Sequence, residues 1–277
     1  MHCRRSELKR ESAYRRLVSG RKTRTLGKQR LRRPSGSLFC CCWLTRRCYY
    51  RTMADLPRKA FGGLLWLFVA MTMTIFGAAG TVNYWQAWLY LTVFFASTIV
   101  MTLDLAKNDP QLLARRSTGG PFAEGTTTQK IIMSFASLGF IALLVVPALD
   151  RRFAWSSMPG FVSIAGDIVF VLSYLAIMHV FHENTFAAST IAVEPGQRVI
   201  STGAYTYVRH PMYAAGLVLL GASPIALGSG WGLLVFIPLI PVLVWRLLDE
   251  EIFLTRNLIG YAENCERVKY RLMPFVW

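Results

Sequence analysis

The chain has 277 residues, of which 53% are hydrophobic, and a mean hydropathy of +0.37. The apolar residues come in long blocks, which is typical of a polytopic membrane protein and excludes a soluble domain with a single core. The net charge of +16 is uneven, because residues 1–52 hold sixteen basic and two acidic residues, whereas the other 225 hold fifteen and thirteen. A charge gathered in one tail does not indicate a nucleic-acid-binding surface, so we expect no nucleic-acid partner.

Residues 1–52 form a basic tail that carries five of the six cysteines and lacks hydrophobic periodicity. No apolar region follows its charges within about 30 residues, so the tail does not match a secretory signal. Two interpretations stay open: a disordered tail that binds anionic lipid or is palmitoylated, or upstream sequence translated ahead of a natural start at Met53. The run Cys40–Cys42 lacks the paired spacing of zinc ligands, and the cysteines do not predict a disulfide framework.

Apolar segments predict membrane-spanning helices, because about 20 such residues cross a hydrocarbon layer of about 30 Å. The first four segments lie at 61–79, 85–105, 131–149 and 161–181. The next apolar block, 212–248, contains Pro224 and two glycines near its middle, so we expect a hairpin with arms at 212–224 and 231–248. The first arm is short for a full crossing. The predicted fold is therefore all-α, with five to six transmembrane helices ending in a helical hairpin.

Basic residues orient these helices, because cytoplasmic segments of membrane proteins are rich in arginine and lysine. With six spans, the polar segments 106–130, 182–211 and 249–277 fall on the same side as the basic N-terminal region. Arg151 and Arg152, partly offset by a neighbouring aspartate, are the exception. We therefore expect a protein of a bacterial inner membrane whose C-terminal polar segment faces the cytoplasm.

The polar segment before the hairpin ends in Gly203-Ala-Tyr-Thr-Tyr-Val-Arg-His-Pro-Met-Tyr-Ala-Ala-Gly216. Pro211 suits the first turn of a helix, which places His210 at the N-cap beside the positive end of the helix dipole. Arg209 offers a planar donor fork for a carboxylate or phosphate. A membrane anchor would explain the basic residues, but the three tyrosines exceed what anchoring needs. We interpret this stretch as the edge of an active site at the membrane surface.

A second polar cluster, Arg246-Leu-Leu-Asp-Glu-Glu251, closes the last apolar helix. Arg246 and Glu250 are four residues apart and share a helix face. Acidic residues at a helix C-terminus oppose the helix dipole, so this cluster indicates either a bound cation or a surface network of ion pairs. The C-terminal Tyr261 and Arg271 are a weaker candidate, since basic and aromatic residues after a last span also act as anchors.

Two histidines, His179 and His182, are spaced so that both could reach one metal from a helix face. No third ligand stands out and the His-Glu-x-x-His pattern is absent, so we expect no metal site. Asn184 and Phe186, which follow, are expected to line the same cavity as the Arg-His-Pro stretch.

Together these motifs resemble the isoprenylcysteine carboxyl methyltransferase family, in its bacterial form, which shares a wider group with the phospholipid N-methyltransferases. The resemblance rests on Gly203-x-Tyr-x-x-Val-Arg-His-Pro-x-Tyr213, on Glu250-Glu251 and on a terminal Tyr…Arg-Leu-x-Pro, and it covers about 175–277. Ile259 and Asn264 depart from the family, whose bacterial members usually have Pro and Tyr there.

The resemblance implies a membrane enzyme that takes a methyl group from S-adenosylmethionine, with transmembrane helices in 53–174 and a catalytic region in 175–277. It implies catalytic roles for Arg209, His210 and Arg246, and acceptor binding by Asn184, Phe186 and Arg246. The implied cofactor site consists of Tyr205, Tyr207, His210, Pro211, Tyr213, Gly216, Glu250, Glu251, Tyr261 and Arg271.

The favoured acceptor is a lipophilic carboxylate, because a carboxylate is already a nucleophile and needs no strong general base. Its lipid part would enter from the membrane, since moving it into water is costly. N-methylation of a phospholipid amine is the nearest alternative. An NADPH-dependent membrane reductase of the sterol type and a membrane protein without catalysis are further alternatives.

Overall fold

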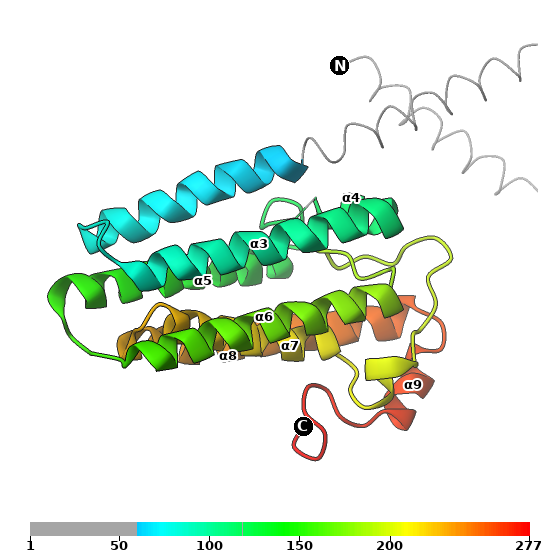
Figure 1. Ribbon diagram of the computed structural model, residues 1–277. Coiled ribbons are helices and arrows are strands. Elements are labelled where there is room, and N and C mark those ends of the chain that lie inside the picture. The colour runs from blue at the N-terminus through cyan, green and yellow to red at the C-terminus, as the bar shows by residue number, and fades with distance from the viewer. Residues whose placement is uncertain (1–59, 118) are drawn as a thin grey trace, which may run out of the picture. The chain divides into compact units, whose positions relative to one another are not determined.

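A computed structural model describes residues 60–117 and 119–277, and every regular element in this part of the chain is a helix (Figure 1). The predicted all-α fold is therefore confirmed. The expectations about the basic tail 1–52 and about a start at Met53 lie outside the described residues.

Five helices are long and apolar enough to cross a membrane, which agrees with an integral membrane protein. They are Ala60–Ala79, α3 (Trp85–Asn108), α5 (Thr127–Phe153), α6 (Gly160–Glu183) and α8 (Gly230–Asn257). A sixth apolar helix, α7 (Pro211–Ala226), is shorter, as predicted for the first arm of the hairpin. The remaining elements are α4 (Pro110–Arg116), the 3-10 turn η1 (Gly203–Thr206) and α9 (Tyr261–Arg267).

Two elements differ from the sequence prediction. The segment 106–130 contains α4, whose start is capped by the Asp109 carboxylate accepting a hydrogen bond from the backbone N–H of Leu112 at 2.9 Å. The last helix, α8, continues to Asn257 instead of ending at 248. Glu250 and Glu251 therefore lie inside α8, and the argument that they oppose the helix dipole at a C-terminus was wrong. Their side-chain partners, described below, explain why acidic residues stand there.

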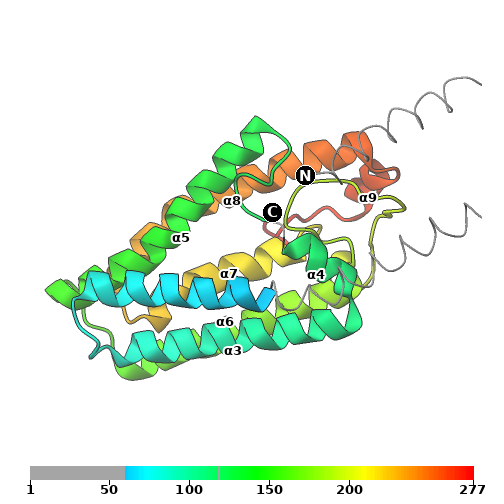
Figure 2. The same ribbon diagram turned by 90° about the horizontal axis from the view of Figure 1, so that it is seen from above.

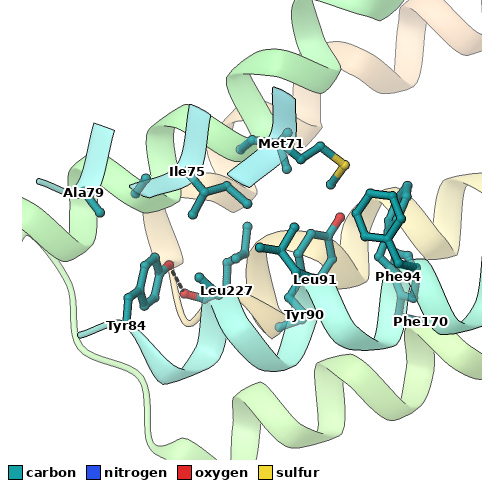
Figure 3. Packing of buried hydrophobic residues seen from close by; sticks show 14 of the residues in the cluster. Met71, Ile75, Ala79, Tyr84, Tyr90, Leu91, Phe94, Phe170 and Leu227 are labelled. Atoms are coloured by element: carbon teal, nitrogen blue, oxygen red, sulfur yellow. Dashed lines mark hydrogen bonds between the residues drawn. The ribbon is translucent and has the colours of Figure 1, made fainter. Parts of the chain in front are cut away.

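The membrane helices pack mainly as two pairs, α6 with α7 and α5 with α8, and α3 lies along α6 (Figure 2). The main hydrophobic core lies near the α7–α8 turn (Figure 3). There Met71 and Ile75 of the first helix, Tyr84 before α3, Phe170 of α6 and Leu227 after α7 are all buried. The Tyr84 hydroxyl donates a hydrogen bond to the carbonyl oxygen of Leu227. This core fixes the turn of the α7–α8 hairpin. The polar side chains described below lie at the other ends of the two helices.

Close contact between α6 and α7 depends on Gly166. A methyl group added at this position would lie 2.6 Å from the backbone nitrogen of Ala226 and 3.0 Å from its Cα. Backbone atoms of a packed helix cannot turn aside as a flexible side chain can, so the two helices would have to separate.

We therefore expect Gly166→Ala to lower the free energy of unfolding by about 1–3 kcal/mol, the usual cost of overpacking. The matched control is Gly77→Ala, because a methyl group at Gly77 meets no atom within 4 Å. In a helix, alanine is favoured over glycine, so the control should keep or raise stability. Thermal unfolding of both variants in detergent measures this. Equal midpoints for the two variants would show that the α6–α7 contact is not tight.

Candidate active site

A cavity of about 380 Å³ lies among α5, the 184–200 segment, the start of α7, the second half of α8 and α9. This volume falls within the range of about 300–1,000 Å³ that is common for small-molecule sites. Many of the predicted site residues line it together: Asn184, Phe186, Tyr205, Arg209, His210, Tyr213, Arg246, Glu250 and Tyr261.

The Arg-His-Pro step lies at the start of α7 as predicted, with His210 at the N-cap and Pro211 in the first turn. Two backbone hydrogen bonds join this step to the C-terminal tail. The N–H of Arg209 donates to the carbonyl oxygen of Tyr270 at 2.9 Å, and the N–H of His210 donates to that of Arg271 at 3.0 Å. The tail therefore supports the cavity wall through backbone hydrogen bonds, which do not depend on the identity of its side chains.

The carboxylate of Glu251 lies at the centre of the basic groups. Its Oε1 is 3.2 Å from both Arg209 Nε and His210 Nε2, and its Oε2 accepts a hydrogen bond from Arg271 Nε at 2.8 Å. The side chains of Arg209, His210 and Glu251 are at most 10% exposed. Because Glu251 and Arg271 do not line the cavity, their contacts hold Arg209 and His210 at its wall from behind.

Arg246 is fixed from α5 and from the segment before it. Its Nη1 donates to Gln129 Oε1 at 2.8 Å, and its Nη2 lies 2.9 Å from Glu124 Oε1, whose side chain is fully buried. The same Nη2 also donates to the carbonyl oxygen of Ser189 at 2.9 Å. Sequence reasoning missed Glu124 and Gln129. The available signal was that Glu124 is the only acidic residue between 110 and 149.

The tyrosines of the wall have polar partners; Tyr261 is buried, and Tyr205 and Tyr213 are half-buried. Tyr213 donates to Glu250 Oε2 at 2.5 Å, Asn184 Nδ2 donates to the Tyr205 hydroxyl at 2.8 Å, and the Tyr261 hydroxyl lies 3.5 Å from His210 Nε2. Burial raises the pKa of Tyr205 to about 12 and also raises the pKa of Tyr261. Both hydroxyls therefore keep their protons at neutral pH and cannot serve there as anionic bases.

Five predicted cofactor residues do not line this cavity: Glu251 and Arg271, whose contacts are described above, and Tyr207, Pro211 and Gly216. The Tyr207 side chain is 69% exposed, Pro211 is buried in the first turn of α7, and a methyl group on Gly216 would meet no atom within 4 Å. Their roles stay predictions. The first glycine of the motif has a structural explanation, because Gly203 has a φ of +54° and a Cβ there would collide with the Glu183 carboxylate.

The two histidines at the end of α6 contact different carboxylates. His179 Nε2 lies 3.0 Å from Glu183 Oε1, and His182 Nε2 lies 2.9 Å from Asp104 Oδ2. Over 60–117 and 119–277, no group of three or more histidine, cysteine, aspartate or glutamate side chains is arranged to hold a metal ion.

The cavity wall is positive on balance. Among the described residues that line it, four arginines (Arg116, Arg198, Arg209 and Arg246) face one acidic residue, Glu250. Burial lowers the pKa of Arg116 to about 10, so this side chain is still cationic at neutral pH. Apolar residues of α5 and α8 complete the wall. The arrangement suits a ligand with an anionic group and an apolar part.

A family model described as phospholipid methyltransferase matches residues 158–259. The matched region runs from the start of α6 through α8, so it includes the Arg-His-Pro step, Arg246 and both glutamates, but not α9 or the tail. No curated protein matches the chain. The match and the five apolar helices support a membrane methyltransferase in the wider group to which the motifs pointed. Methyltransferases of that family generally use S-adenosylmethionine.

Removing the charge of Glu251 should unfold this part of the site. In Glu251→Gln, the buried guanidinium of Arg209 loses its counter-charge, which typically costs about 3–5 kcal/mol when one partner of a buried pair is removed. The matched control is Glu263→Gln, because Glu263 is exposed on α9. Thermal unfolding in detergent should show a large loss for the first variant and almost none for the second. Equal stability of both would contradict the central role given to Glu251.

Proposed function

We propose that the protein transfers a methyl group from S-adenosylmethionine to a carboxylate of a lipophilic acceptor. The observation that carries this proposal is the cavity wall at the end of the membrane helices. It combines arginines, one acidic residue, aromatic rings and apolar side chains. The family match over 158–259 supports the reaction class.

The wall offers a partner for each part of the cofactor. Glu250 can accept hydrogen bonds from its ammonium group, and the rings of Tyr205 and Tyr213 can attract its sulfonium cation. Arg209 contacts Glu251 through Nε and lines the cavity, so its guanidinium can pair with the cofactor carboxylate. The residues present therefore fit this cofactor. When bound, it supplies a methyl group on positive sulfur, which leaves as the carbon–sulfur bond breaks and a carbon–oxygen bond to the acceptor forms.

The favoured acceptor is one that needs no general base from the described wall. Tyr205 and Tyr261 hold their protons, and His210 Nε2 is engaged by the Glu251 carboxylate. A carboxylate needs no deprotonation at neutral pH. Alignment and exclusion of water can then provide most of the rate. Arg246, immobilised by Glu124, Gln129 and Ser189, would orient the acceptor carboxylate through its positive charge and its remaining N–H groups.

A second candidate is N-methylation of a phospholipid amine, which the description of the matched family favours. The phosphate of such a lipid also suits a wall rich in arginine. Its amine is protonated at neutral pH and must lose a proton before it can attack. The two candidates therefore differ in their dependence on pH and on the acceptor supplied.

The reaction is tested with purified protein, labelled methyl donor and three acceptors: a farnesylcysteine analogue, phosphatidylethanolamine and total lipid of the host. We expect label in the farnesylcysteine analogue. His210→Ala should lose about 10²-fold in rate, because the wall at the N-cap of α7 is then misplaced. The control His182→Ala, whose histidine contacts Asp104 outside the cavity, should keep its activity. Wild-type rates in both His210→Ala and Glu251→Gln would refute the proposed site, and label in phosphatidylethanolamine alone would establish the second candidate.

The pH dependence separates the two chemistries independently. With a carboxylate acceptor, the rate should stay nearly constant between about pH 6.5 and 9, because the acceptor is already ionised. The Tyr205 hydroxyl stays protonated throughout this range, since burial raises its pKa to about 12. A rate that climbs about tenfold per pH unit would instead indicate an amine that must be deprotonated.

A further inference from the structure

Asn264 brings an unpaired polar atom to the cavity wall. It lies on α9 three residues after Tyr261, and both side chains line the cavity. Asn264 is only 8% exposed, and its Oδ1 is buried without a hydrogen-bond partner among the described residues. Its backbone is fixed, since its N–H donates to the carbonyl oxygen of Gly260 at 3.2 Å. Buried polar atoms in native proteins nearly always have partners, so this oxygen calls for a donor from a ligand.

The surroundings of Asn264 indicate what kind of ligand group would supply that donor. Along α8 the wall is charged at Arg246 and Glu250 and becomes apolar at Leu254 and Leu258. Leu258 lies twelve residues after Arg246, which is about 18 Å along the helix. α8 leads directly into α9, so Asn264 lies at the end of the cavity that is lined by the two leucines and by Tyr261, whose hydroxyl is 3.5 Å from His210 Nε2. A flat, neutral group with a hydrogen-bond donor at its edge fits this end better than an ammonium or a carboxylate does.

Adenine has this chemistry. Its exocyclic amino group donates, and the ring nitrogen beside it accepts, whereas an asparagine amide offers the reverse pair of groups. We propose that Asn264 recognises the adenine ring of S-adenosylmethionine, with Oδ1 accepting from the amino group and Nδ2 donating to the adjacent ring nitrogen. Tyr261 and the two leucines pack around the ring. This inference rests on the proposed function and adds a residue that determines cofactor specificity, at a position where the resemblance carries over no cofactor contact.

The test compares two ligands in calorimetric titrations of the full chain in detergent. The ligands are S-adenosylhomocysteine and its analogue with hydrogen in place of the adenine amino group. We expect the wild-type protein to bind the analogue about 10- to 100-fold more weakly. Asn264→Leu should bind both ligands with the same, weakened affinity. Asn264→Asp keeps an acceptor oxygen and should keep the preference for the amino group.

The control is Asn257→Leu, the same change at an exposed asparagine near the end of α8, which should retain wild-type affinity and preference. If the wild-type protein shows no preference, or if Asn264→Leu retains it, Asn264 does not recognise adenine, although the proposed function stands. If Asn264→Leu does not fold, loss of the preference in Asn264→Asp overturns the inference. If the wild-type protein binds neither ligand, the proposed function itself fails.

Discussion

The cavity depends on a single buried carboxylate. Glu251 of α8 meets Arg209 and His210 at the start of α7 and Arg271 of the C-terminal tail, so one side chain joins three segments that are far apart in the sequence. Burying the Arg209 guanidinium without a counter-charge would cost several kcal/mol. The α7–α8 hairpin makes the contact possible, because its turn is anchored in the hydrophobic core and its two arms return to the same end of the bundle.

A second buried ion pair fixes Arg246 at the cavity wall. Glu124 and Gln129 hold Arg246 from the α5 side, so the α5–α8 pair carries a polar network at the end where the α6–α7 pair carries the Arg-His-Pro step. Both networks involve α8, through Glu251 in one and Arg246 in the other. Along α8 the cavity is lined first by the charged side chains of Arg246 and Glu250 and then by Leu254 and Leu258, and Tyr261 and Asn264 of α9 follow.

Much of this arrangement could be predicted from the sequence, and the rest could not for physical reasons. Blocks of apolar residues revealed the five long helices, and the proline after His210 revealed the helix start. The end of α8 was misjudged, because ion pairs formed across the fold let the helix continue through its acidic residues. Glu124 and the tail's backbone hydrogen bonds were missed, since a partner more than a hundred residues away, or a main-chain group, leaves no local pattern. In the sequence, Asn264 is only a departure from a family motif. Its burial and its position in the cavity lining indicate a role in ligand binding.

The central claim is that S-adenosylmethionine binds between the start of α7, the second half of α8 and α9. It is tested most directly by irradiating the purified protein with methyl-labelled S-adenosylmethionine in ultraviolet light and mapping the labelled peptides by mass spectrometry. The account predicts label in peptides that contain Tyr205, Tyr213 or Tyr261, and competition by unlabelled S-adenosylhomocysteine. Label confined to the helices before 117, or label that a competitor does not displace, would contradict it.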